Sequence, residues 1–206
     1  MKKRKTVDRF FRSQSLDKQI GGLYALLTYG SWGLLPIYWK LLNTTSALEI
    51  LAHRMLWSMV FVFGLLAVQK RLNEILELFK SSKNIWLLLF TSLLLGCNWF
   101  VYIYAINTGQ VIEASLGYYI NPLLNVLMGF IFLRERLNFL QFMALGLATL
   151  GVLNFLWDFG SLPWIALSLS FTFALYGLLR KVIPVKPLVG LLFETVLLSP
   201  LAIIMI

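Results

Sequence analysis

The chain consists of long apolar runs separated by short polar connections. Seven runs of about twenty residues cover 20–41, 47–68, 85–106, 111–133, 139–157, 161–180 and 188–206. A helix of about 20 apolar residues spans the ~30 Å hydrocarbon core of a bilayer. The pattern therefore predicts seven transmembrane helices in an all-α, polytopic membrane protein.

The longest connection, 69–84, has a pattern of its own. Its apolar residues recur at the i, i+3, i+4 and i+7 positions of a helix, namely Leu72, Ile75, Leu76 and Phe79. One apolar face on a short polar segment is typical of a helix that lies on a membrane surface. We therefore expect a short amphipathic helix between the second and third runs.

Composition supports a lipid environment. Hydrophobic residues make up 59% of the 206 residues and charged residues 13%, whereas soluble domains carry about 25% charged residues. The net charge of +9 does not indicate nucleic-acid binding, because the basic residues lie before and between the apolar runs rather than across one polar face.

The basic residues also predict the orientation. Seven of them precede the first run, so residues 1–19 form a basic arm. The second, fourth and sixth connections hold Lys70, Arg71, Lys80, Lys83, Arg134, Arg136, Arg180, Lys181 and Lys186, and the other three hold no Lys or Arg. Since basic loops stay in the cytoplasm, we expect a cytoplasmic N-terminus and Ile206 at or near the outer side.

A weak internal repeat appears when the sequence is shifted by 140 residues. The shift carries residues 22–28 onto 162–168 and Lys40 onto Arg180, so the unit is five helices. An odd number of helices inverts the second copy, an arrangement common in transporters. We divide the chain into a first repeat over 20–157 and the first two helices of an incomplete second repeat over 158–206. We expect the chain to be a fragment or a truncated reading frame.

Charged groups inside apolar runs are candidates for function, because each costs about 2.5–3.5 kcal/mol at a helix centre. The second run holds Glu49 and His53 on one helical face, with Arg54 about 100° around. A cluster that binds a solute or couples an ion is one interpretation. The alternative is a structural ion pair, or an arginine packed on helix carbonyls.

The fourth run carries a four-residue repeat of small and polar groups, Glu113, Gly117, Asn121, Asn125 and Gly129. Pro122 interrupts the backbone hydrogen bonds at mid-run and frees the carbonyl of Tyr118. We interpret this run as a helix that lines a pore. The alternative is a tightly packed helix whose Asn side chains bond to neighbours.

Other apolar runs contribute fewer polar groups. Asn98 and Tyr102 share a face of the third run, and the 140-residue shift places Glu194 of the seventh run opposite Arg54. The full set of cavity or coupling candidates is Glu49, His53, Arg54, Asn98, Tyr102, Glu113, Ser115, Tyr118, Asn121, Pro122, Asn125 and Glu194.

Known catalytic and cofactor motifs are absent from the sequence. No P-loop or HExxH motif occurs, and one Cys with one His excludes a Cys/His zinc site within one chain. We therefore predict no metal, no cofactor and no enzymatic activity.

Three segments of the chain are distinctive: YALLTYGSWGLLPIYWK from Tyr24, SALEILAHRMLWS from Ser46 and NWFVYIYAINTGQVIEASLGYYINPL from Asn98. They resemble the RarD group of EamA-type transporters, within the drug/metabolite transporter superfamily. The resemblance implies a plasma-membrane transporter with ten helices in two inverted five-helix repeats, in a group whose name is linked to chloramphenicol sensitivity. This chain departs from it by ending two helices into the second repeat.

The favoured function is a secondary carrier of a metabolite or drug-like solute that works by alternating access. Glu113, or the Glu49–His53 pair, is a candidate for coupling a proton. The expected partners are the bilayer, a small-molecule substrate and a second copy of the chain in a homodimer. The alternatives are a non-transporting fragment or assembly subunit, a seven-helix receptor, and an intramembrane enzyme using Ser58 or Ser115 near His53.

Overall fold

The computed structural model describes residues 20–206, apart from Ala25, Tyr29, Trp39, Asn43, Lys80 and Ser161. The predicted basic arm, 1–19, and Lys80 lie outside the described residues. The chain divides after Leu42 into two units. Seven of its helices are long and apolar enough to cross a membrane. The prediction of an all-α, polytopic membrane protein is confirmed.

The first unit contributes one of these helices, Ile20–Tyr38. The second unit holds the helices α2 (Ala47–Val68), α3 (Asn73–Leu78), α4 (Ser82–Asn107), α5 (Val111–Phe132), α6 (Phe139–Phe159), α7 (Trp164–Val182) and α8 (Pro187–Met205). The predicted runs differ from these bounds by no more than three residues at any end.

Local capping chemistry explains where several helices begin and end. The Ser46 hydroxyl accepts from the backbone N–H of Glu49 at the start of α2, and Asn138 forms a reciprocal capping box with Gln141 at the start of α6. Gly160 ends α6 in a left-handed conformation (φ 70°) that glycine adopts without a steric cost. Pro187 occupies the first turn of α8, where a missing N–H does no harm.

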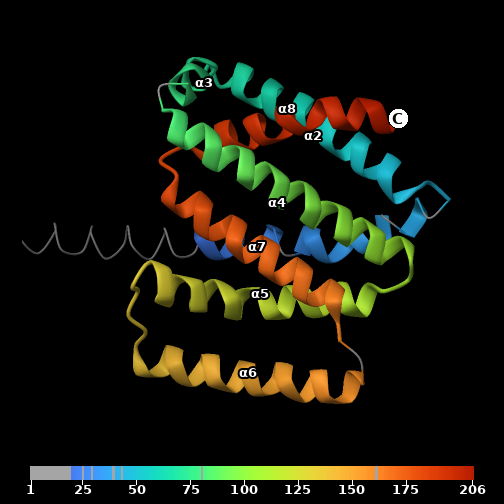
Figure 1. The fold of residues 1–206 in the computed structure, drawn as a ribbon, viewed down its shortest axis with the longest axis vertical. Helices are drawn as coiled ribbons and strands as arrows, with labels where there is room; N and C mark the ends of the chain where they lie inside the picture. The colour runs from blue at the N-terminus through green and yellow to red at the C-terminus, as the bar shows by residue number, and fades with distance from the viewer. Residues whose placement is uncertain are drawn as a thin grey trace, which may run out of the picture. The chain divides into compact units, whose positions relative to one another are not determined.

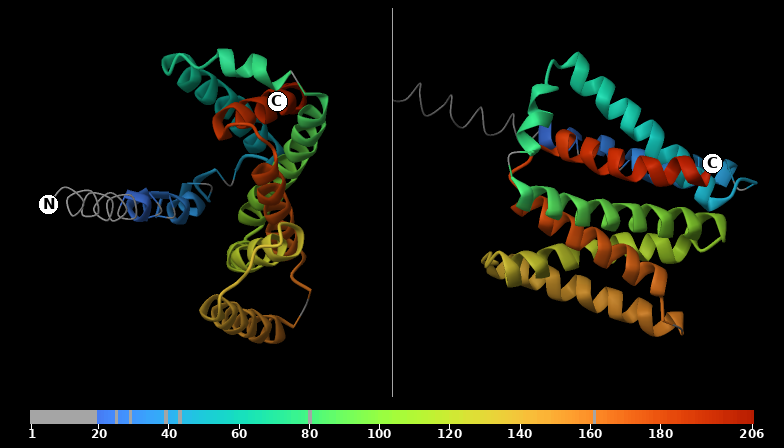
Figure 2. Two further views of the ribbon diagram at one scale, coloured as in Figure 1. Left: turned by 90° about the vertical axis from the view of Figure 1, so that its left-hand side faces the viewer. Right: turned by 45° about the horizontal axis from the view of Figure 1, so that its top comes forward.

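The long helices of the second unit pack in a row, in the order α6, α5, α7, α4, α8 and α2 (Figures 1 and 2). Helix α7 therefore lies between α4 and α5, and α8 lies between α4 and α2. The helices that follow residue 158 pack among those that precede it. The division into two repeats stays a prediction from the sequence.

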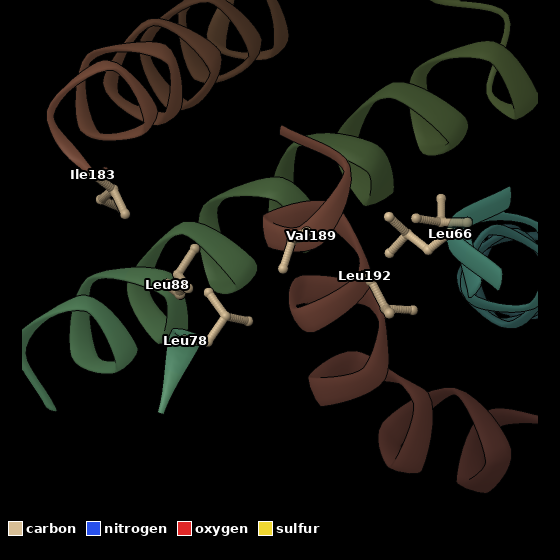
Figure 3. Packing of buried hydrophobic residues seen from close by; sticks show 7 residues of the cluster. Leu66, Leu78, Leu88, Ile183, Val189 and Leu192 are labelled. Carbon is tan, nitrogen blue, oxygen red and sulfur yellow. The ribbon is translucent and has the colours of Figure 1, made fainter. Parts of the chain in front are cut away.

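An apolar cluster holds one end of the row together. Leu66 of α2, Leu78 of α3, Leu88 of α4 and Val189 and Leu192 of α8 are all buried there. Figure 3 shows the two α8 side chains lying between Leu88 and Leu66. The cluster fixes the register between α2, α4 and α8, and it also attaches the short helix α3.

Helix α6 is the opposite case. It has a mean hydropathy of 1.8, yet none of the residues in its most apolar window is buried. A helix that is apolar on every face is stable only in an apolar solvent or core. Among its described neighbours, α6 packs mainly on α5, and its other faces are apolar and exposed.

The predicted amphipathic helix is confirmed as α3, although its buried face differs from the prediction. Leu78 is buried, while Leu76 is 68% exposed. Ion pairs also hold α3: the Arg71 guanidinium donates two 3.0 Å hydrogen bonds to Glu74, and Lys186, the N-cap of α8, donates one of 2.6 Å. Glu74 thus ties α3 to the start of α8.

This ion pair predicts how the attachment of α3 depends on pH. Hydrogen bonds from Arg71, and then from Lys186, lower the pKa of Glu74 from 4.5 to about 2. A group with a lowered pKa in the folded state stabilises that state above its unfolded pKa. We expect α3 to stay attached above about pH 4.5 and to loosen as pH falls towards 2. Amide hydrogen exchange in α3 measures this, and Glu74→Gln should remove the dependence.

Candidate functional site

One face of α4 carries the buried polar groups at the centre of the row. Thr91, Asn98 and Tyr102 are buried, and they lie seven and then four residues apart on one helical face. Asn98 donates to the backbone carbonyl of Leu169 (3.0 Å) and to the Thr172 hydroxyl (2.9 Å). Helix α4 is therefore joined to α7 by hydrogen bonds at mid-helix.

A second set of contacts joins α4 and α7 to α8. Glu194 of α8 is fully buried, with no exposed surface. Its Oε1 accepts from the Thr91 hydroxyl (2.7 Å) and its Oε2 from the Tyr176 hydroxyl (3.1 Å). The Nε of Arg180 lies 3.8 Å from Oε1. We call these four residues the Glu194 cluster.

The Arg180 guanidinium is incompletely satisfied. Its Nη2 donates to the backbone carbonyl of Pro187 (3.2 Å), and its buried Nη1 has no hydrogen-bond partner in the described part of the chain. The guanidinium occupies the space that a β-carbon on Gly190 would need. Gly190 therefore provides the notch in α8 through which Arg180 approaches Glu194.

A third polar group surrounds Arg54. Its guanidinium carbon lies 4.3 Å from the centre of the Trp99 ring, a cation–π geometry. Tyr102 and Tyr118 interact electrostatically with Arg54, and their rings meet edge to face, with centroids 5.7 Å apart. Arg54 is half-buried, whereas Tyr118 is 41% exposed. We call these four residues the Arg54 group.

Glu113 has a structural contact. The buried Oε2 of Glu113 accepts from the backbone N–H of Ile165 at 3.1 Å, in the first turn of α7. The N-cap of α7 is Pro163, which supplies no side-chain hydrogen bond. Glu113 therefore caps α7 from the neighbouring helix.

The four-residue repeat of α5 faces α7. A β-carbon on Gly117 would lie 3.0 Å from the carbonyl oxygen of Ala166. Asn121 donates to the carbonyl of Ser170 (3.5 Å), and Asn125 donates to Asn121 (2.6 Å). These are the contacts expected from the packing alternative, in which Asn side chains bond to a neighbouring helix.

The remaining candidates lie apart from these groups. Glu49 and His53 are exposed on α2, and Pro122 is exposed within a continuous α5. Ser115 lines an apolar groove of about 480 Å³ between α5 and α6. The structure thus brings Arg54 together with Tyr102 and Tyr118, and Asn121 together with Asn125, while Glu194 meets residues that were not predicted.

Those unpredicted residues are Thr91, Tyr176 and Arg180. From the sequence alone, Arg180 is grouped with the basic residues that predict the orientation of the chain in the membrane, because it lies near the end of its apolar run. One sequence signal favours another role: Tyr176 and Arg180 are four residues apart, so they share a face of α7. Thr91 has no such signal, since its partner lies on another helix.

Comparison with known proteins gives consistent matches. The profile of the EamA-like transporter family matches residues 19–157. The chain is 49% identical over 184 residues to the protein RarD of Salmonella typhimurium, covering 89% of this chain and 63% of that one. It is 46% identical to an uncharacterized transporter of Vibrio cholerae, covering 95% of this chain and 65% of that one.

A third relative is more distant. The chloramphenicol-sensitive protein RarD of Pseudomonas aeruginosa is 34% identical, over 82% of this chain and 58% of that one. The chain thus spans less than two thirds of the length of each of these three relatives. No solved structure matches the chain.

Proposed function

Since the chain belongs to the EamA-like transporter family, in its RarD group, we propose that it moves a metabolite or drug-like solute across the plasma membrane. It works as a secondary carrier by alternating access. The observation that supports this best is Arg54, a permanent charge held half-buried inside a membrane-spanning helix against Trp99. Such a charge is costly in lipid, and charges inside membrane-spanning segments commonly mark a substrate or ion pathway.

The chemistry of the Arg54 group favours an organic anion. A guanidinium binds a carboxylate through two parallel hydrogen bonds, and it can keep its stacking contact with an aromatic ring at the same time. Trp99 and the partly exposed Tyr118 offer flat surfaces to the apolar part of the same solute. An aromatic or aliphatic carboxylate fits both requirements.

A proton gradient is the proposed driving force. Glu49 and His53 are exposed on α2. Glu113 contacts another helix. The hydrogen bond that Glu113 accepts from Ile165 persists when the carboxyl is protonated, because its carbonyl oxygen still accepts. Protonation of Glu113 therefore leaves this link between α5 and α7 in place.

The function is tested by solute movement in membrane vesicles. A panel of amino acids, organic acids and chloramphenicol is offered with and without a pH gradient. We expect saturable, gradient-dependent movement of at least one organic anion. A version extended to the full length of the relatives tests the fragment alternative: if only the extended version moves a solute, the solute path needs helices beyond Ile206. If neither does, the carrier proposal is wrong.

Arg54→Gln should weaken solute binding. One hydrogen bond to a charged group contributes about 1.5–3 kcal/mol, so we expect KM to rise about 10- to 100-fold. Arg54→Lys should recover only part of this, because an ammonium lacks the planar fork. Phe61→Leu, at a 71% exposed position on the same helix, is the control. An unchanged KM in Arg54→Gln would remove Arg54 from the solute site.

A further inference from the structure

Glu194 is placed where one proton alters the contacts of three helices. Its carboxylate has no exposed surface, and it meets Thr91 of α4 and Tyr176 and Arg180 of α7. Within the described chain, no other group has a resolved electrostatic effect on it. At this end of the row, α2 contributes apolar side chains, Val62 and Leu66, to the packing against α8.

The Thr91 hydroxyl can satisfy either protonation state of Glu194. It lies 2.7 Å from Oε1 of Glu194 and 3.0 Å from the carbonyl oxygen of Leu88, but a hydroxyl has only one proton to donate. With Glu194 ionised, Thr91 donates to the carboxylate. With Glu194 protonated, the acid donates to Thr91, and the threonine proton turns to Leu88. No heavy atom has to move for this exchange.

Arg180 responds to the two states differently. Its Nε lies 3.8 Å from Glu194, which is longer than a hydrogen bond, so charge attraction is the main link between them. Protonation of Glu194 removes that attraction, so the guanidinium keeps only the Pro187 carbonyl and its contact with the Tyr176 hydroxyl, while Nη1 stays without a partner in the described chain. Arg180 lies in the last turn of α7, where a long side chain can extend its charge towards the membrane surface.

We propose that Glu194 is the proton-binding group of this carrier, and that Arg180 is released from α8 when the proton binds. This inference rests on the proposed function. The ionised state links α7 to α8 through the Arg180–Glu194 attraction, with the guanidinium in the notch at Gly190. The protonated state keeps the Thr91 and Tyr176 contacts and loosens that link. Proton binding thereby changes how α7, which also bonds to α4 and α5, is held against α8.

The transport test compares Glu194→Gln with the wild type. We expect the stimulation of uptake by a pH gradient to disappear, while exchange of solute across the membrane without a gradient continues. Thr195→Val is the matched control, because this buried neighbour donates its hydroxyl only within α8. It should keep the stimulation. Gradient-driven uptake that survives in Glu194→Gln would overturn the proposal.

A second measurement does not depend on transport or on a single variant. The infrared C=O band of a protonated carboxyl is followed as the pH of the vesicles is lowered. We expect one titrating component to vanish in Glu194→Gln, and to shift in frequency in Thr91→Val, where the hydroxyl partner is lost. If the wild type moves no solute but shows this component, the carrier function fails and the proton site stands. If the titrating C=O component is the same in the wild type, Glu194→Gln and Thr91→Val, the assignment of the proton to Glu194 is wrong.

Discussion

Replacing Gly117 with leucine is expected to separate α5 from α7 and to abolish the stable fold of the second unit. A β-carbon at this position would lie 3.0 Å from both the carbonyl oxygen of Ala166 and the β-carbon of Leu169. Neither atom is the end of a flexible side chain, so the helices themselves must move. Overpacking of this kind costs about 1–3 kcal/mol and sometimes more.

The loss extends beyond one steric contact. The seam between α5 and α7 also contains the cap that Glu113 provides for Ile165 and the bond from Asn121 to Ser170. Both hydrogen bonds lengthen when the two backbones separate, and unsatisfied polar groups are costly in lipid. We therefore expect a larger effect than an overpacked core alone would give.

The measurement is thermal unfolding in detergent, followed by the retention of helix content. The matched control is Gly146→Leu on α6, where an added β-carbon meets nothing within 4 Å. That variant should unfold like the wild type. Equal unfolding temperatures for Gly117→Leu and Gly146→Leu would show that α5 and α7 do not pack as the structure has them.

The membrane-spanning helices could be predicted almost completely from the sequence. Bilayer thickness fixes the length of an apolar run, so seven runs indicate seven helices whatever their arrangement. The ends are less certain, because polar turns continue a helix past the apolar part. Helix α4 begins at Ser82, three residues before the predicted run, since Ser82, Lys83 and Asn84 are polar but helical.

The site was harder to predict, because hydrogen-bond partners depend on which helices are neighbours. The sequence marks Glu194 as costly in lipid, yet its partners lie 103 residues away at Thr91 and 18 residues away at Tyr176. Only the order of the helices in the row brings them together. By contrast, the local pattern of Glu49 and His53 was read correctly as one face, but that face is exposed.

Arg180→Met is expected to destabilise the second unit strongly, because it leaves the carboxylate of Glu194 buried without its cation. The side chains of Arg180 and Glu194 are 12% and 0% exposed. Removing one partner of a buried ion pair costs about 3–5 kcal/mol. Reversible unfolding in detergent at neutral pH measures this loss.

Lys181→Met is the matched control at the adjacent position. Lys181 also pairs with a carboxylate, that of Glu135, but these side chains are 60% and 48% exposed. Exposed pairs contribute about 0–1 kcal/mol, so this variant should unfold almost like the wild type. A large loss of stability in Arg180→Met and a small one in Lys181→Met would then reflect the difference in burial between the two ion pairs.

A double variant separates the pair from the packing around it. In Arg180→Met combined with Glu194→Leu, neither charge of this pair remains, and buried pairs replaced by apolar residues often retain stability. We expect the double variant to be more stable than Arg180→Met alone, with a coupling of about 2–3 kcal/mol in the cycle. Purely additive losses would mean that Arg180 stabilises the fold by filling space beside Gly190. Protonation of Glu194 would then have no cation to release, and the proposed link between the proton and α7 would lose its physical basis.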